Sequence, residues 1–219
     1  MAVVAIASAK GGVGKSTLAI LLGAEFALDG YTVAIIDSDL NQHTAAFGLK
    51  CTLPGLRVIP DVGEAEILKA LREAEAKSDI VLIDLPGGSS TLALKAMQRS
   101  HFVLVPMRPS LPDARDAMKT VAQIDDAEEL ARTPIARALV WTLFRSGFES
   151  KVSRHVRKSL EGQGVPILRS ALMERSAFQA IHLTGKVPRQ AEPKSAAAAN
   201  VTALAQEVME SLQVKEDAA

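Results

Sequence analysis

Residues 9–17, with the sequence AKGGVGKST, constrain the fold of this chain more than any other segment. They lie between an apolar run, residues 3–7, and a helical pattern, residues 16–28. The three glycines have no Cβ, so backbone N–H groups there can converge on the oxygens of a phosphate. The N-terminus of the following helix adds a partial positive charge. The segment therefore predicts a strand, a phosphate-binding loop and a helix in direct succession.

The loop matches most of the P-loop pattern G-x-x-x-x-G-K-[ST], with Ala9 in place of the first glycine. In such a loop Lys15 reaches the β- and γ-phosphates, and the hydroxyl of Ser16 is a ligand of Mg²⁺. The flanking strand and helix are those that the pattern requires. We therefore expect the loop to bind a nucleotide.

Aspartates end two of the predicted strands. The segment IIDSD puts Asp37 and Asp39 after one strand, and VLIDLPGG puts Asp84 after another. Asp84 has the place of a Walker B aspartate, which accepts a hydrogen bond from Mg²⁺-bound water. Carboxylates at such positions can also be helix caps or turn residues. Their coincidence with the loop favours a magnesium site, so we expect ATP and Mg²⁺ as cofactors.

Short apolar runs alternate with longer helical patterns along the chain. This order predicts an α/β fold of the P-loop NTPase type, with a mostly parallel sheet flanked by helices on both faces. We expect residues 1–219 to form a single domain, with a loose connector near 186–200 before a C-terminal helix, residues 201–212. The other predicted strands are residues 32–37, 56–60, 79–84, 102–106, 138–143 and 166–169. The other predicted helices are residues 64–77, 90–99, 149–161, 174–183 and one that begins at Pro112.

Composition limits the environment of the chain. Hydrophobic residues make up 48% of its 219 positions, which is enough for a packed core. Cys51 is the only cysteine, which excludes an internal disulfide and a multi-cysteine metal site and fits a reducing cytosol. The apolar N-terminus lacks the basic start of an export signal. No apolar run approaches the roughly 18 residues of a membrane span.

Together, KGGVGKST, DSD and DLPGG resemble the deviant-Walker ATPases of the ParA/MinD group. The likeness extends from the first strand through VPMRPSLPDARDA, and it is closest to small ParA-like partition and positioning ATPases. The GG of DLPGG and the LNQ after Asp39 differ from the commonest sequence of the family at these positions. The resemblance implies slow, partner-stimulated hydrolysis of ATP to ADP and phosphate, and an ATP-dependent homodimer.

The resemblance also implies roles for single residues. Lys10 matches the family's signature lysine, which reaches across a two-fold interface to the phosphates of the other subunit. Asp39 would orient the attacking water and so join Lys10 and Lys15 as a catalytic residue. Adenine contacts are expected from residues 106–110 and from the loop that follows ALVWTLFR, residues 138–145. The expected nucleotide-binding residues are Lys10, Gly11, Gly12, Val13, Gly14, Lys15, Ser16, Thr17, Pro106 and Arg108, and the expected Mg²⁺ residues are Ser16, Asp37 and Asp84.

The charges are unevenly distributed. Lys and Arg outnumber Asp and Glu by six within residues 145–194, although the net charge of the chain is zero. In residues 151–160 the basic side chains are predicted on one face of a helix, opposite Val152, Val156 and Leu160. The basic face is either an ordinary solvated surface or a patch for DNA phosphates, and no pattern indicates sequence-specific recognition. The candidate DNA-binding residues are Lys151, Arg154, Arg157, Lys158, Arg169, Arg175, Lys186 and Arg189.

These features favour an ATPase that partitions or positions DNA or protein cargo in the cytoplasm, in association with the nucleoid. Its expected partners are a second copy of itself, non-specific DNA, and a cargo adaptor or ParB-like activator. A MinD-like, membrane-cycling regulator of division is an alternative, because residues 201–212 carry an apolar stripe. The acidic residues around that stripe argue against a membrane partner. An ATP-dependent biosynthetic enzyme remains open, whereas a redox enzyme like the nitrogenase iron protein needs more than one cysteine.

Overall fold

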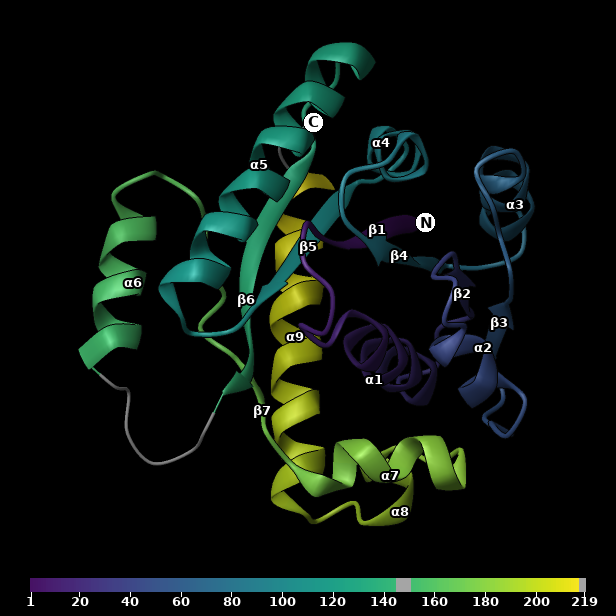
Figure 1. The fold of residues 1–219 in the computed structure, drawn as a ribbon. Coiled ribbons are helices and arrows are strands. Elements are labelled where there is room, and N and C mark those ends of the chain that lie inside the picture. The colour runs from purple at the N-terminus through teal and green to yellow at the C-terminus, as the bar shows by residue number, and fades with distance from the viewer. Residues whose placement is uncertain (145–150, 217–219) are drawn as a thin grey trace.

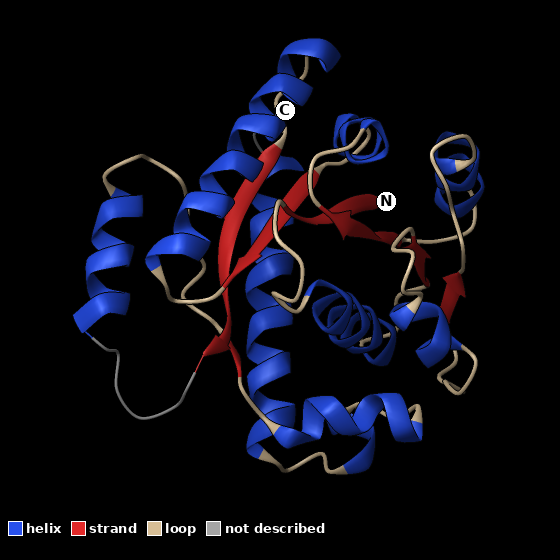
Figure 2. Ribbon diagram, viewed as in Figure 1, coloured by secondary structure: helices blue, strands red, loops and turns tan. Residues whose placement is uncertain are grey.

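The computed structural model describes residues 1–144 and 151–216. Within these residues the chain forms one sheet of seven parallel strands, in the order β3-β2-β4-β1-β5-β6-β7. Helices cover both faces of the sheet (Figure 1, Figure 2), which confirms the predicted fold class. The strands are β1 (Ala2–Ser8), β2 (Val33–Asp37), β3 (Leu56–Ile59), β4 (Ile80–Gly87), β5 (Phe102–Met107), β6 (Ala136–Phe144) and β7 (Leu172–Met173). The helices are α1 (Lys15–Leu28), α2 (His43–Gly48), α3 (Ile67–Glu75), α4 (Thr91–Gln98), α5 (Leu111–Ala131), α6 (Lys151–Glu161), α7 (Ser176–Thr184), α8 (Pro188–Ala191) and α9 (Ala196–Glu216).

Two apolar clusters hold the layers together. The central strands are buried on both faces because they consist mostly of valine, isoleucine, leucine and alanine. On one face α3, α4, α5 and α6 pack in one cluster, and on the other α1, α2, α7 and α9 pack in a second. Residues 18–27 of α1 are all buried. The helix after the glycine-rich loop is therefore fixed by the core.

The strand register brings the predicted site residues to one edge of the sheet. β4 lies between β1 and β2, and Asp84 is the register partner of Asp37. Gly87, further along β4, pairs with Ser8 at the end of β1. A Cβ at Gly87 would lie 3.1 Å from the backbone nitrogen of Gly11, so β4 passes directly against the loop. Ligands of parallel sheets bind at this carboxyl edge.

The C-terminal segment differs from its prediction. Residues 186–200 are not a loose connector, because α8 begins at Pro188 and α9 begins at Ala196 rather than at residue 201. Ala197 and Val201 are buried in the cluster around α1. The alanines before Val201 are also strong helix formers. Packing and propensity together thus extend the helix toward its N-terminus.

Two short segments differ from their predictions, and part of a third prediction lies outside the described residues. The predicted strand 166–169 contributes one bridge, between Ile167 and Leu139, and β7 is the next strand of the sheet. α2 was not predicted, because six residues show too little periodicity to indicate a helix. Positions 149 and 150 of the predicted helix 149–161 lie outside the described residues.

Candidate functional site

The glycine-rich loop leads from β1 into α1 and leaves the first turn of α1 open. Gly14 is the N-cap of α1 and has a left-handed backbone with φ of 90°, a conformation that favours glycine. Among the described residues, no side chain caps this helix. The first N–H groups of α1 are therefore available to an anion.

Lys15 is the first residue of α1 and is only 6% exposed. Burial lowers the pKa of Lys15, while the negative charges of Asp84 and Asp39 act to raise it. A buried ammonium group needs anionic partners to offset its lost hydration. The phosphates of a nucleotide can supply them, in keeping with the role predicted for Lys15.

Asp84 is fully buried in β4. Its Oδ2 accepts a hydrogen bond from Thr44 Oγ1 at 2.8 Å, whereas its Oδ1 has no partner among the described residues. Burial raises the pKa of Asp84 to about 6, although hydrogen bonds from Ser16 and Thr44 and the charge of Lys15 act to lower it. A carboxylate in this environment is stabilised by a cation.

The groups around Asp84 fit a magnesium ion. Mg²⁺ prefers oxygen ligands and keeps waters and phosphate oxygens in its shell. Ser16 supplies a hydroxyl beside the Asp84 carboxylate, which has one buried oxygen without a partner. Within the described ranges, no group of three or more His, Cys, Asp or Glu residues could hold a metal. Ser16 and Asp84 would hold Mg²⁺ together with a phosphate, as P-loops do.

Asp37 and Asp39 hold the segment that enters α2. Asp37 Oδ2 accepts a hydrogen bond from the Ala45 N–H at 2.8 Å, and Asp37 Oδ1 accepts one from the Asp39 N–H at 3.1 Å. Asp37 thus stabilises the first turn of α2, and its place near Mg²⁺ stays a prediction. Asp39 is half-buried, and its Oδ1 accepts from the backbone and side-chain N–H groups of Asn41 at 2.9 and 2.8 Å.

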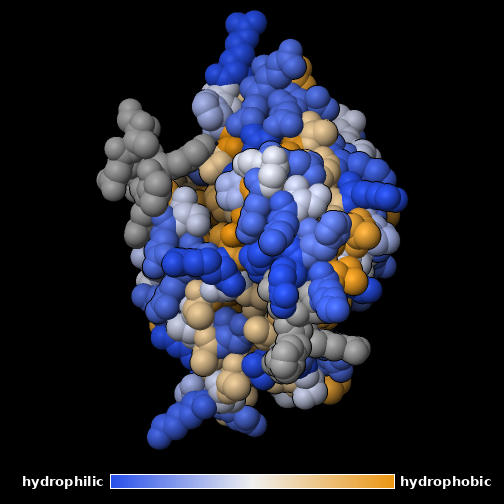
Figure 3. Space-filling view, turned by 90° about the vertical axis from the view of Figure 1, so that its left-hand side faces the viewer, coloured by the Kyte–Doolittle hydropathy of each residue, from blue (hydrophilic) through white to orange (hydrophobic). Residues whose placement is uncertain are grey.

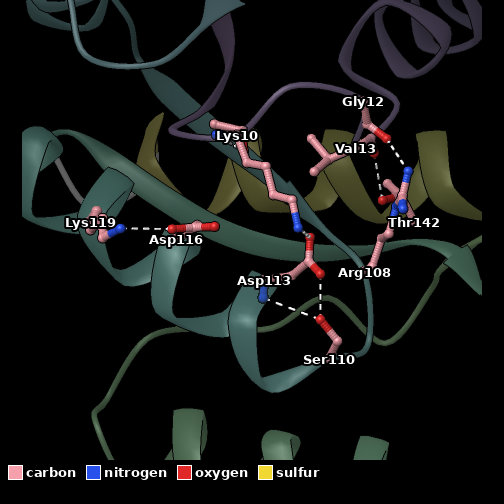
Figure 4. A network of polar contacts seen from close by, with 10 residues as sticks. Lys10, Gly12, Val13, Arg108, Ser110, Asp113, Asp116, Lys119 and Thr142 are labelled. Atoms are coloured by element: carbon pink, nitrogen blue, oxygen red, sulfur yellow. Dashed lines mark hydrogen bonds and ion pairs between the residues drawn. The ribbon is translucent and has the colours of Figure 1, made fainter.

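Lys10 points toward the N-terminus of α5 (Figure 4). Its Nζ lies 3.1 Å from Asp113 Oδ1, and the two side chains are 38% and 5% exposed. Asp113 also accepts a hydrogen bond from the hydroxyl of Ser110, the N-cap of α5. Lys10 is thus paired within its own chain in this structure, and its contact with a second subunit stays a prediction.

The other predicted nucleotide-binding residues differ in how they reach the loop. Arg108 donates a hydrogen bond to the Gly12 carbonyl, and Val13 is buried. Thr17 is half-buried in the first turn of α1. Pro106 is buried within β5, so its ring offers little exposed surface to an adenine. Arg108, which follows the last residue of β5, is exposed and is therefore the better placed of the two to contact a nucleotide.

Two threonines that the sequence patterns did not indicate form hydrogen bonds within the site. Thr44 donates to Asp84 from α2, and Thr142 Oγ1 in β6 donates to the Val13 carbonyl at 2.7 Å. Both threonines are fully buried. Thr142 is 129 positions from Val13 and Thr44 is 40 from Asp84, so no local pattern reveals either contact. The only signal was a hydroxyl near the end of the predicted strand 138–143.

α6 exposes most of its predicted cations. Lys151, Arg154 and Lys158 are exposed. The side of the molecule on which α6 lies carries mostly hydrophilic side chains (Figure 3). Arg157 is half-buried, and its guanidinium carbon lies 5.7 Å from the centre of the Trp141 ring. Arg157 therefore packs largely on β6, and α6 presents three of its four cations to solvent.

The buried face of α6 differs from its prediction at one position. Val152 is 52% exposed, whereas Ser153, Val156 and Leu160 are buried. The core thus contacts residues spaced i, i+3 and i+7, instead of i, i+4 and i+8. Both spacings suit a helix, so the sequence pattern left the rotation of α6 open.

Lys186 and Arg189 do not extend the cations of α6. They lie at α8, next to Val187, which is buried in the cluster on the opposite face of the sheet from α6. Arg189 forms ion pairs with Glu25 at 3.2 Å and Asp29 at 2.6 Å. Because Glu25 is only 1% exposed, Arg189 compensates a buried charge in addition to pairing with Asp29.

Arg169 and Arg175 also have other contacts or limited exposure. Arg169 forms ion pairs with Glu207 at 3.4 Å and Glu210 at 3.5 Å. Arg175 is half-buried before α7. Arg169, Arg175, Lys186 and Arg189, which were candidates for extending the basic face of α6, therefore lie apart from that face or are paired with carboxylates. Binding of DNA by α6 stays a prediction.

The apolar stripe of the C-terminal helix belongs to the core. Leu204 and Val208 are 0% exposed and pack in the cluster around α1. The stripe on which the membrane-cycling alternative rested is thus already covered. Of the helices in the described ranges, none is long and apolar enough to traverse a membrane.

Comparisons with known proteins agree with this geometry. The family model for the CobQ/CobB/MinD/ParA nucleotide binding domain matches residues 4–188. Protein ParA of Rhizobium radiobacter is 33% identical over 186 residues, which cover 84% of each chain. The maintenance of carboxysome distribution protein A of Halothiobacillus neapolitanus is 25% identical over 179 residues, covering 80% of this chain and 81% of the other. The septum site-determining protein MinD of Pyrococcus horikoshii OT3, complexed with Mg-ADP, has a similar fold, with a TM-score of 0.75, 20% identity, and coverage of 94% of this chain and 95% of that one.

Proposed function

The chain belongs to the CobQ/CobB/MinD/ParA family of nucleotide-binding proteins, and from this premise we propose that it is an ATPase that partitions or positions a cargo. In this proposal, binding of ATP causes two copies of the chain to form a homodimer, and the dimer binds DNA without sequence specificity. Hydrolysis of ATP then separates the two subunits and releases the DNA. A cargo adaptor or activator of the ParB kind would stimulate hydrolysis. One observation carries the nucleotide part: buried Lys15 and buried Asp84, of opposite charge, lie at the uncapped start of α1.

The site residues divide the work of phosphoryl transfer. The N–H groups of the loop and the ammonium of Lys15 neutralise the phosphates, and Ser16 and Asp84 hold Mg²⁺. When bound, Mg²⁺ neutralises charge on the phosphate oxygens. Asp39 orients the attacking water; in support, it is half-buried and its charge acts on Lys15. Positioning and charge neutralisation are the main requirements of this reaction.

Lys10 links ATP to the dimer in this proposal. Its side chain is 38% exposed, so it can leave Asp113 and reach a second copy of the chain. A contact with the phosphates of the other subunit exists only when the triphosphate is present. To move the population from 1:99 to 99:1, ATP must favour the dimer by about 5.5 kcal/mol.

The DNA surface proposed here is α6, with Lys151, Arg154 and Lys158 exposed on one helix. Non-specific binding by one such patch is weak, with a Kd on the order of 10⁻⁴ to 10⁻⁶ M at physiological salt. An ATP-bound dimer carries two patches, and the second binds at a high effective concentration. DNA affinity therefore follows the nucleotide state.

A DNA mobility shift with ADP, ATP and a slowly hydrolysed analogue, run beside liposome sedimentation, tests this function. We expect shifts with ATP and the analogue, little shift with ADP, and no liposome binding. Lys151→Glu with Lys158→Glu should abolish the shift. The control, Lys186→Glu with Lys194→Glu, makes the same charge change on exposed lysines near α8 and should leave it intact. Equal shifts in ADP and ATP, or equal loss in both variants, would contradict the proposal.

The nucleotide and dimer steps are tested separately. Lys15→Ala should lose binding of Mg·ATP by calorimetry, because the buried cation beside the phosphates is gone. Lys10→Ala should bind Mg·ATP with little change but remain monomeric in light scattering. A normal ATP-dependent dimer of Lys10→Ala would remove the role given to Lys10.

A further inference from the structure

Thr142 contacts the glycine-rich loop from a strand that follows it by more than a hundred residues. Its Oγ1 donates a hydrogen bond to the Val13 carbonyl at 2.7 Å, and Thr142 is 0% exposed. A Cβ built on Gly14 would lie 3.9 Å from the Thr142 Cβ. Figure 4 shows the Thr142 side chain beside the Val13 carbonyl, and the end of β6 thus lies directly against the Val13–Gly14 peptide.

The direction of that hydrogen bond fixes the direction of an amide. A trans peptide is planar, and its C=O and N–H bonds point to opposite sides. With the Val13 carbonyl held toward β6, the N–H of Gly14 must point away from β6. Within residues 1–144 and 151–216, the Gly14 N–H has no acceptor. It is therefore a donor that the loop leaves available for a ligand.

Arg108 acts on the preceding peptide in the same way. Its guanidinium donates a hydrogen bond to the Gly12 carbonyl from the end of β5. By the same geometry the N–H of Val13 points away from Arg108, and in the described part of the chain it also has no acceptor. β5 and β6 are neighbours in the sheet, so two adjacent strands orient two consecutive loop amides.

We infer that Thr142 is a positioning residue, which holds the Val13 carbonyl so that the Gly14 amide is aimed at a nucleotide phosphate before the nucleotide arrives. Arg108 does the same for the Val13 amide from a more exposed place. The inference rests on the proposed function, because it requires that the loop bind phosphates. Pre-orientation matters because a glycine-rich segment has more conformational freedom to lose on binding than any other.

The ligand feature that Thr142 serves is the phosphate chain and not the base. Thr142→Val removes the hydroxyl and keeps the shape, and it should weaken Mg·ATP and Mg·ADP by about tenfold, the effect of one well-made hydrogen bond. Tripolyphosphate should lose affinity by a similar factor. Thr142→Ser restores the donor and should bind within about twofold of the parent. Affinities are measured by calorimetry, so the readout does not depend on hydrolysis.

A control separates positioning from general destabilisation. The buried hydroxyl of Ser100 donates a hydrogen bond to the Ala96 carbonyl at 2.8 Å. This contact lies at the C-terminal end of α4, away from the glycine-rich loop. Ser100→Ala should lower the melting temperature as Thr142→Val does and leave nucleotide affinity unchanged. The fluorescence of Trp141, the only tryptophan, checks folding next to the substituted position.

The outcomes distinguish the two levels of the argument. If the parent protein does not bind Mg·ATP, the proposed function is contradicted. If the parent and a folded Thr142→Val variant bind Mg·ATP equally well, only the positioning role of Thr142 is overturned. The same holds if Thr142→Ser binds Mg·ATP as weakly as Thr142→Val does. Should Thr142→Val not fold, Arg108→Met tests the same geometry at an exposed position, and unchanged tripolyphosphate affinity there overturns it.

Discussion

The ion pair between Lys10 and Asp113 should oppose dimerisation, and Asp113→Asn should therefore strengthen the ATP-dependent dimer. Lys10 cannot contact a partner's phosphates while its Nζ remains 3.1 Å from Asp113 Oδ1. The amide of asparagine still offers an oxygen to the Ser110 hydroxyl, so the start of α5 keeps that hydrogen bond. The substitution thus removes mainly the charge that retains Lys10.

The magnitude follows from exposure. Lys10 is 38% exposed and Asp113 is 5% exposed, so the pair is partly screened by water. Exposed pairs contribute about 0.2–1 kcal/mol, and a dimer breaks two of them, so its Kd should fall by about 2- to 30-fold. Loss of the Asp113 charge at the N-terminus of α5 costs about 0.3–1 kcal/mol of folding stability, but monomer and dimer share that cost.

Sedimentation equilibrium with the slowly hydrolysed ATP analogue measures this change, with ADP as the reference state. In a Lys10→Ala background, Asp113→Asn should have no effect on the dimer, because the cation it releases is absent. The reasoning is refuted if Asp113→Asn dimerises no better than the parent, or gains equally in the Lys10→Ala background. Either result would mean that Asp113 does not hold Lys10 back.

Two further predictions concern buried carboxylates. The pKa of Asp84 is raised from 3.8 to about 6, so its contribution to apo stability is full below pH 3.8 and lost as the pH rises through about 6. Mg²⁺ needs the ionised form of Asp84, so Mg·ADP affinity measured by calorimetry should rise as the pH rises through about 6. Thr44→Val removes a hydrogen bond that lowers the pKa of Asp84, so it should move the midpoint of this rise to higher pH. A midpoint that does not move argues against the Thr44 contact. Arg189→Ala should cost about 2 kcal/mol, less than a fully buried pair, and lower the melting temperature by roughly 4–8 °C, with Lys186→Ala as a neutral control. Burial raises the pKa of Glu25, so the part of this deficit that comes from Glu25 should be largest at neutral pH and be lost as the pH falls through that raised pKa. The part that comes from the ion pair with Asp29 remains, and a deficit independent of pH would exclude Glu25 as a source.

Much of the fold could be predicted because its signals are local. The loop glycines, the apolar strands and the helical periodicities each act over a few neighbouring residues, and β1, β4 and α1 appear close to their predicted positions. The same is true of Lys15, Ser16 and Asp84, whose places follow from one loop and one strand end. Where local signals were weak, as in the six residues of α2 or the alanine run before Val201, the prediction was incomplete or wrong.

Other features depend on which elements become neighbours. α6 and α8 pack on opposite faces of the sheet, so cations close in sequence do not form one surface. The rotation of α6 placed Ser153 in the core and Val152 outside it. Neither the separation of these cations nor the buried face of α6 can be predicted from charge or periodicity. The spacings of the basic and of the apolar residues are each compatible with more than one way of packing the helices on the sheet.

By itself, then, the sequence determined a phosphate loop between a buried strand and a buried helix, with acidic strand ends beside it. It could do so because glycine spacing and strand periodicity are properties of adjacent residues. Only the tertiary structure decided that Thr44 reaches Asp84, that Thr142 holds the loop, and that Lys10 pairs with Asp113. Each of these contacts joins segments that meet only when β2, β4, β1, β5 and β6 lie side by side, and the strand order is set by packing of the whole sheet.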